Sequence, residues 1–249
     1  MVSPLKKQRD AILLRVKRND ATASGTASTE AGSYALLASK DSLHIKLVEF
    51  EQDKLVLKEF ASIDKKVEHK RNVLIPKYKP MVEAYLEAGE AYQNPIFTDL
   101  IVWLFDAEDL DTAISWCIQA IEQGLPTPEN LKCNWPTFAV RSVLEWSEAQ
   151  ARNGNSFEPY YGRINEQLLE DEWDVPNQLH AQWLKFAAYA LLTDDDRKVK
   201  PSSIGNVEHL ERALALMEQA EDKHNKIGVA TKVKEVKSRL KAIQEGTNL

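Results

Sequence analysis

Three features of the sequence predict an all-α fold. Apolar residues recur three and four positions apart through most of the chain, as in Leu110, Ala113, Ile114 and Cys117, which is the spacing of one helix face. No stretch alternates apolar and polar residues convincingly enough to indicate a strand. Breaks that contain proline or glycine separate the periodic segments. We therefore expect a basic helical arm, a central multi-helix bundle with tetratricopeptide-like hairpins, and a C-terminal helical hairpin.

The first expected segment, residues 1–30, is a basic arm with a flexible linker. Ile12, Leu13 and Val16 lie at helical spacing among basic residues, which predicts a short helix. Residues 21–28 have small side chains that bury too little surface to offset the entropy of ordering. We therefore expect this stretch to tether the arm to the rest of the chain.

Residues 31–79 form the next expected segment, a long helical region. Its apolar residues have the periodicity of long helices. Val56, Phe60, Ile63 and Val67 are spaced 4, 3 and 4 residues apart, as in a coiled coil. Fewer than three heptads are visible, so the same residues are equally suited to packing within one chain.

Residues 80–193 are expected to form a central helical domain, because Pro76 and Pro80 interrupt the preceding pattern. Asp109 stands where a helix needs an N-cap, and Gly124 stands where a terminating residue of positive φ is favoured. A polar Asn-Gly-Asn turn at 153–155 ends a later helix. The expected helices cover residues 80–92, 96–106, 110–123, 137–151, 158–171 and 176–193.

Residues 194–249 are expected to form a polar linker, at 194–203, and a C-terminal helical hairpin. The second helix of this hairpin has an apolar stripe suited to packing on a partner helix. The stripe consists of Val229, Val233, Val236, Leu240 and Ile243.

One helical pattern occurs twice in the chain. Leu110, Ala113, Ile114 and Ala120 recur with identical spacing as Leu210, Ala213, Leu214 and Ala220. The repetition suggests two related hairpins of tetratricopeptide-like character.

The charges are unevenly distributed. Residues 1–80 carry 16 Lys and Arg against 10 Asp and Glu, whereas residues 81–193 carry 5 against 18. The formal net charge of −6 therefore conceals a basic N-terminal third. Such asymmetry is typical of an arm that binds polyanions, although solvated charges on ordinary helix faces are the alternative.

No cofactor is expected, and we assign no catalytic residue and no metal ligand. The chain has no phosphate-binding loop of the G-x-x-x-x-G-K-[ST] type. Its best cluster of carboxylates is Asp106, Glu108, Asp109 and Asp111, where helix capping explains most of the pattern. No uncharged span approaches the roughly 18 residues of a membrane helix, so no membrane is expected as a partner.

The tryptophans are interpreted by their neighbours. Trp103, Trp116, Trp146 and Trp183 lie on or beside apolar helix faces, so we expect them in the core. Trp135 and Trp173 have more polar surroundings and are interpreted as interface residues.

One region carries a resemblance to a known family. It runs through Leu74, Pro76, Pro80, Leu86, Gly89, Ile96, Trp103, Asp106, Asp109, Ala113, Ala120, Gly124, Leu125 and Pro128. With this spacing it resembles the terminase small subunits of temperate, contractile-tailed phages that package from cohesive ends, a family often labelled the terminase endonuclease subunit. Ser3, Pro4, Lys6 and Lys7 resemble the family's Ser-Pro followed by paired basic residues.

The sequence departs from the family at two places. Relatives usually have Gly between the acidic residues of a Trp-x-x-Asp-x-Gly-Asp turn, whereas this chain has Glu108, which argues against a turn that requires positive φ. The chain also lacks the long basic C-terminal tail of some relatives.

The resemblance implies a small terminase subunit that binds viral DNA at the cohesive-end packaging site and directs cleavage and packaging by a large ATPase-nuclease subunit. The implied partners are double-stranded viral DNA, the large subunit, and further copies of the chain in a homo-oligomeric ring, all in the host cytoplasm. DNA contacts are expected from basic side chains of the first two segments. These are Lys6, Lys7, Arg9, Arg15, Lys17, Arg18, Lys65, Lys66, Lys70 and Arg71.

Two alternatives stay open. One is a tetratricopeptide-like adaptor that binds proteins without touching DNA. The other is a metal-dependent endonuclease that uses the carboxylates between Asp106 and Asp111.

Overall fold

The computed structural model describes residues 29–89, 93–169 and 173–247, and the side chains from residue 44 onward within these ranges. The chain divides into two compact units, Met1–Glu59 and Phe60–Leu249. The described secondary structure is helical except for one isolated bridge between Thr193 and Val199. The predicted all-α class is therefore confirmed, while the basic arm lies outside the described residues.

The first unit contains α2 (Thr29–Glu59), a long helix with apolar side chains on its open surface. Ile45, Val48 and Leu55 are 65%, 51% and 50% exposed. The coiled-coil pattern predicted from Val56 onward is not one helical stripe, because α2 ends at Glu59 and α3 begins at Ile63. The apolar pattern of residues 34–71 predicts two helices or one long broken helix, which agrees with this break.

The second unit begins with three helical segments in direct succession: α3 (Ile63–His69), the π-helical turn η1 (Lys70–Leu74) and α4 (Ile75–Ala88). The expected interruption at Pro76 and Pro80 was wrong, since both lie inside α4. Proline clashes with the carbonyl four residues earlier in a regular helix. The wider turn of η1, in which the Ile75 N–H donates to the Lys70 carbonyl, accommodates the first proline, because it changes the register just before Pro76.

Four of the following helices begin at a side-chain cap, of which Asp109 was expected, and the expected Gly124 and Gly154 follow helix ends. Asn94, Asp109, Asn134 and Asn206 each accept a backbone N–H at a helix start. Gly154 ends a helix with a φ of +76°, and Gly124 has a φ of +67°. The helices are α5 (Pro95–Asp106), α6 (Leu110–Glu122), α7 (Trp135–Asn153), α8 (Tyr160–Leu169), α9 (Asn177–Leu191), α10 (Val207–Lys223) and α11 (Ala230–Gln244).

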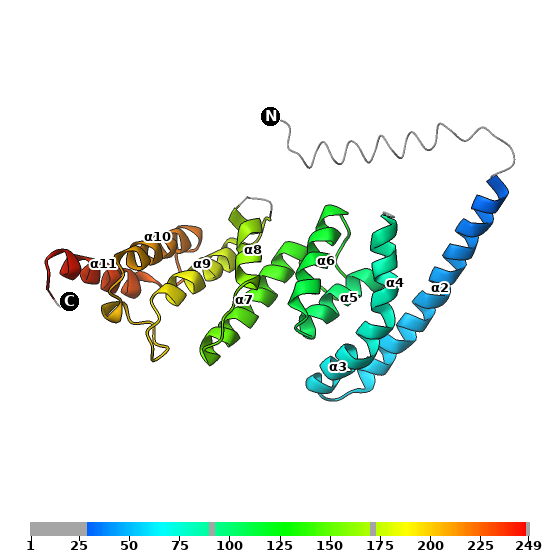
Figure 1. Cartoon of the computed structure of the whole chain (residues 1–249), viewed down its shortest axis with the longest axis horizontal. Coiled ribbons are helices and arrows are strands. Elements are labelled where there is room, and N and C mark those ends of the chain that lie inside the picture. The colour runs from blue at the N-terminus through cyan, green and yellow to red at the C-terminus, as the bar shows by residue number, and fades with distance from the viewer. Residues whose placement is uncertain (1–28, 90–92, 170–172, 248–249) are drawn as a thin grey trace. The chain divides into compact units, whose positions relative to one another are not determined.

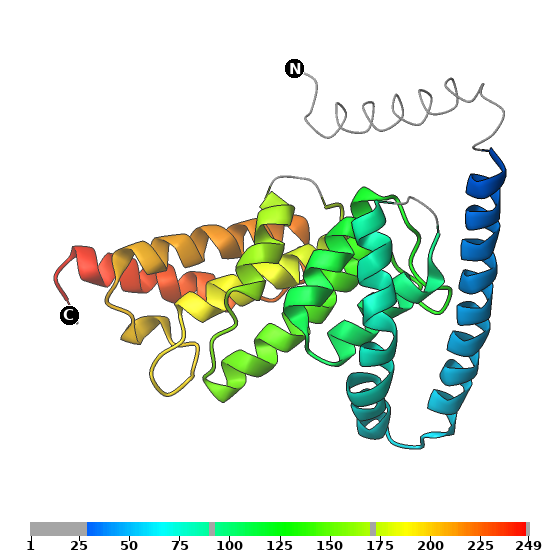
Figure 2. The same cartoon turned by 45° about the vertical axis from the view of Figure 1, so that its right-hand side comes forward.

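Within this second unit, neighbouring helices in sequence are also the main neighbours in space. α4 packs on α5, α5 on α6, α6 on α7, α9 on α10 and α10 on α11, while α7 contacts both α8 and α9. Figures 1 and 2 show α4 to α11 following one another in this order. The core therefore runs along a row of helices.

The C-terminal end of the row has its own apolar cluster. Leu192 directly after α9, Leu210 and Met217 from α10, and Val229 and Val236 beside and within α11 are buried together. Val233, Leu240 and Ile243 pack against the same cluster. The stripe predicted to face a partner helix is therefore used within the chain.

The repeated apolar pattern is mostly buried in both of its copies, on α6 and on α10. Burial of such residues is a general requirement of helix packing. The tetratricopeptide-like relation between the two helices remains a prediction.

The tryptophans expected in the core are buried or half-buried, with Trp183 fully buried. The interpretation of Trp135 and Trp173 as interface residues was wrong, since they are only 3% and 6% exposed. Trp135 donates its indole N–H to the Leu125 carbonyl at 3.0 Å, which satisfies its polar end inside the fold.

Candidate nucleic-acid interface

Four of the predicted DNA-binding residues lie on the segment formed by α3 and η1. Lys65 is exposed and Lys66 is half-buried. Neither side chain has an ion pair or hydrogen bond with the part of the chain that the structure describes. Lys70 and Arg71 follow on the π-helical turn. The other predicted residues, Lys6, Lys7, Arg9, Arg15, Lys17 and Arg18, lie outside the described residues.

Lys70 and Arg71 both contact the turn between α5 and α6. Lys70 Nζ lies 2.6 Å from Asp106 Oδ2 and 5.8 Å from the centre of the Trp103 ring, with 16% of the Lys70 side chain exposed. Arg71 donates from Nη2 to the Ala107 carbonyl at 2.9 Å. Because Ala107 ends α5, this cation also lies where a helix dipole favours positive charge. These two residues thus hold the basic segment against the turn.

In the turn itself, the end of α5 is followed by a residue in the left-handed backbone region, and α6 begins directly afterwards. The N–H of Asp109 donates to the Leu104 carbonyl and that of Glu108 to the Phe105 carbonyl, which is the Schellman arrangement. Glu108 has a φ of +60°. The inference that a glutamate here argues against positive φ was therefore wrong. Only residues 107–109 separate the two helices, so the chain has to reverse within this motif.

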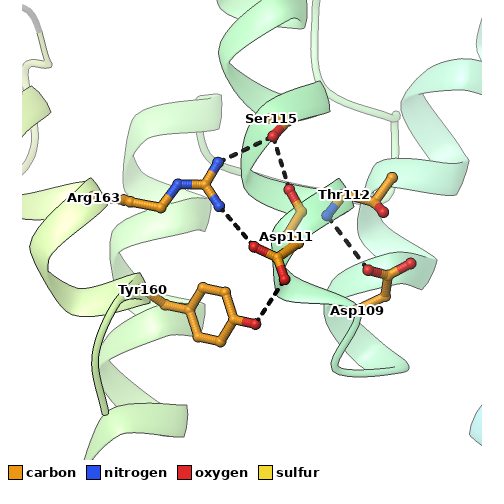
Figure 3. Close-up of polar contacts among 6 residues, drawn as sticks. All are labelled: Asp109, Asp111, Thr112, Ser115, Tyr160 and Arg163. Carbon is orange, nitrogen blue, oxygen red and sulfur yellow. Dashed lines mark hydrogen bonds and ion pairs between the residues drawn. The ribbon is translucent and has the colours of Figure 1, made fainter.

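Asp109 and Asp111 have structural partners on either side of α6. Asp109 accepts the N–H of Thr112 at 3.4 Å as an N-cap, and Lys79 Nζ lies 3.6 Å from its other oxygen. Asp111 accepts the phenol of Tyr160 at 3.0 Å and contacts Arg163 Nη1 at 3.2 Å (Figure 3). Both partners of Asp111 belong to α8, so this carboxylate joins α8 to the first turn of α6.

Arg163 and Tyr160 complete this network. Arg163 donates from Nη2 to Ser115 Oγ at 3.0 Å, and Ser115 donates to the Asp111 carbonyl oxygen at 2.8 Å (Figure 3). Desolvation and the hydrogen bond to Asp111 raise the pKa of Tyr160 above its ordinary value. Tyr160 therefore remains a neutral donor at neutral pH.

The carboxylates between Asp106 and Asp111 thus act mainly as caps and ion-pair partners. In residues 29–89, 93–169 and 173–247, no three His, Cys, Asp or Glu side chains are grouped closely enough to hold a metal ion. Basic side chains, by contrast, gather beside the turn. Three of them, Lys70, Arg71 and Lys79, contact it directly.

A second group of basic residues, at 223–241, was not predicted from the sequence. Residues 223–241 carry seven Lys and Arg against Glu235 alone, whereas residues 206–222 carry five Asp and Glu against Arg212. In the net charge of residues 194–249, the positive charge of the first run and the negative charge of the second cancel. A shorter window would have revealed the basic helix α11.

None of the described helices is long and apolar enough to cross a membrane.

Comparison with known proteins gives consistent matches. Residues 47–178 match the family described as the phage small terminase subunit. The chain is 30% identical over 222 residues to the probable terminase endonuclease subunit of Haemophilus phage HP1, covering 89% of this chain and 75% of that protein. It is 27% identical over 176 residues to the terminase endonuclease subunit of Escherichia phage P2, covering 70% and 67%. No solved structure gives a significant match.

Proposed function

The chain belongs to the phage small terminase subunit family, and we propose on this basis that it binds double-stranded viral DNA at the cohesive-end packaging site. Membership of the family gives it a role in phage DNA packaging. We further propose that it directs cleavage and packaging by a large ATPase-nuclease subunit in the host cytoplasm. The relatives named as endonuclease subunits suggest that this chain takes part in the cut.

The observation that carries the DNA-binding proposal is the solvent face of α3, where Lys65 and Lys66 lie beside the exposed Asp64 and Glu68. Lys65 and Lys66 have no carboxylate partner among the described residues, so they are available to phosphates. Lys70 and Arg71 support this face by fixing the helix on the α5–α6 turn. In this arrangement Lys65 and Lys66 contact phosphates and contribute affinity. Lys70 and Arg71 hold α3 in place against the α5–α6 turn. The N-terminal arm would add further phosphate contacts.

Assembly into a homo-oligomeric ring is supported by α2. Three of its apolar side chains, Ile45, Val48 and Leu55, are at least half exposed, and their spacing of three and seven residues places them on one face. Contact with another copy would remove this face from water. A ring would also bring many weak basic contacts to one DNA segment.

The test is a DNA-binding titration of the purified full chain at two salt concentrations, with and without a divalent cation. Replacing Lys65 and Lys66 together by Ala should weaken binding and make the salt dependence shallower by up to about 1.8, since each lost phosphate contact removes about 0.9 from the slope. Lys198→Ala is the matched control, because this lysine is 73% exposed and lies on a distant loop.

The outcomes separate the alternatives. Absence of DNA binding at low salt would favour the protein-binding adaptor. Metal-dependent cleavage by the isolated chain would favour an intrinsic nuclease. A slope that stays unchanged in the double variant would remove α3 from the interface.

A further inference from the structure

We infer that the outer face of α11 is a second duplex-DNA contact, formed by a ridge of three lysines, Lys234, Lys237 and Lys241. This inference rests on the proposed DNA-binding function and assigns it an additional surface. The ridge lies outside residues 47–178, which match the family, and is distant in sequence from the basic segments of the N-terminal third. The three lysines are all exposed.

The cations of α11 fall into two groups with different surroundings. Lys232 donates to the Val199 carbonyl at 2.9 Å and Arg239 donates to the Ile204 carbonyl at 3.0 Å. These two are partly buried and fasten the preceding loop to the helix. The ridge lysines make no such backbone contact in the described part of the chain. Fastening the fold therefore does not account for the ridge.

The spacing places the ridge on one face of the helix. Lys234, Lys237 and Lys241 are three and four residues apart, which aligns them along the axis. Seven residues at 1.5 Å each give the ridge a length of about 10 Å. Duplex DNA carries one phosphate per about 1.7 Å of its axis, so a ridge of this length faces several phosphates at once.

The neighbouring carboxylates leave the ridge available. Lys237 lies 2.8 Å from Glu218 of α10, but both side chains are more than half exposed. Lys241 lies 3.7 Å from Glu245, and both are again mostly exposed. Ion pairs of this kind contribute little stability in water, so a phosphate can replace the carboxylate. Glu235 on α11 is engaged by Lys232 at 2.8 Å.

The helix dipole favours only one of the three ridge lysines, Lys241, which lies in the last turn of α11. α11 has no acidic residue in its first turn, and Lys232 and Lys234 lie within its first five residues, where the helix dipole favours negative charge. Lysines three and four residues apart also repel one another. An anionic partner along the outer face would relieve this repulsion.

The location on the hairpin allows a DNA contact without disturbing the core. α10 and α11 lie side by side in both views (Figures 1 and 2). α11 packs on the apolar cluster through Val233, Val236, Leu240 and Ile243. The ridge occupies exposed positions on the flank of the helix beside α10, next to the buried stripe but outside it. Substituting the lysines should therefore leave the fold intact.

The experiment compares the wild-type chain with a triple variant, Lys234→Ala, Lys237→Ala and Lys241→Ala, on a 30-bp duplex of arbitrary sequence. Arbitrary sequence suffices because phosphate contacts carry no sequence information. Loss of three contacts should make the salt slope shallower by about 2.7. When the salt concentration rises from about 50 to about 200 mM, the affinity of both proteins falls. The fold-loss of the wild type should be about forty times that of the variant. Circular dichroism and thermal unfolding verify that the variant is folded.

Two further variants make the test specific. Glu218→Gln should strengthen DNA binding, because it releases Lys237 from its carboxylate; a merely structural lysine would not produce this gain. Lys132→Ala removes an exposed lysine from the segment between α6 and α7 and controls for the loss of one positive charge at another site.

The result that overturns the inference is a folded triple variant with an unchanged salt slope while the α3 variant loses affinity. That outcome leaves the proposed function standing. A change in oligomeric mass without a change in slope would also overturn it, since the ridge would then contact an acidic surface of another copy. Absence of DNA binding by the wild type would remove the proposed function and this inference together.

Discussion

Glu108 occupies a backbone conformation that favours glycine, so Glu108→Gly should stabilise the protein. Its φ is +60°, a region that costs an L-residue about 1 to 2 kcal/mol. Glycine removes this cost but adds about 0.4 to 1 kcal/mol of unfolded-state entropy. The net gain is about 0.5 to 1 kcal/mol. Both hydrogen bonds of the turn are made by backbone atoms, so the substitution preserves them.

Chemical and thermal unfolding of the full chain test this prediction. For a protein of this size, the gain corresponds to a rise of about 1 to 4 °C in Tm. Glu108→Ala is the matched control, because it removes the same carboxylate but keeps the unfavourable φ, and it should give no comparable gain. Gly124→Ala is the converse: its φ is +67° and an added Cβ would meet no atom within 4 Å. The backbone cost less the unfolded-state entropy should therefore appear as a net loss of about 0.5 to 1 kcal/mol. A lower unfolding midpoint for Glu108→Gly than for the wild type would refute the reasoning.

Three further predictions concern the helices around this turn. Trp103→Ala should lower the free energy of unfolding by about 3 to 5 kcal/mol in chemical denaturation, because the side chain is only 5% exposed; loss of DNA binding at unchanged stability would instead make it a contact residue. Asp111→Ala should cost less than about 1 kcal/mol by the same measurement, since the carboxylate is 74% exposed and such pairs are weak; a larger loss would mean that α8 depends on it. Tyr161→Phe should cost about 1 kcal/mol at neutral pH through the hydrogen bond to the Trp183 carbonyl. Burial raises the pKa of Tyr161, so the fold favours the neutral phenol. Wild-type stability should therefore fall above a pH of about 10, where the unfolded chain releases this proton, and the Phe variant should lose less stability over that range.

Helix type and capping were the predictable part of this molecule. Asp109 and Gly124 marked helix ends correctly, because caps depend on local backbone chemistry. The path through Pro76 and Pro80 was not predictable, since a register change over five preceding residues accommodates the proline. Trp135 was misread because its neighbours are polar while its indole finds a carbonyl ten residues away in sequence.

The candidate interface was predictable only as a set of charges. Sequence located Lys65 to Arg71 as a basic run, but it could not separate the open Lys65 from Lys70, whose partner Asp106 is 36 residues distant. That distinction depends on how α3 and η1 lie against the α5–α6 turn. The basic ridge of α11 was missed for a simpler reason, since the acidic residues of α10 cancel its charge in any long window.

The row of helices in the second unit also has a consequence for folding. Because each helix packs chiefly on helices near to it in sequence, most stabilising contacts form by closing short loops. Such local topology favours rapid folding that starts in one part of the row and spreads to its neighbours. Damage should be correspondingly local: loosening the cluster around Met217 would release α10 and α11 while the helices around Trp103 keep their own packing.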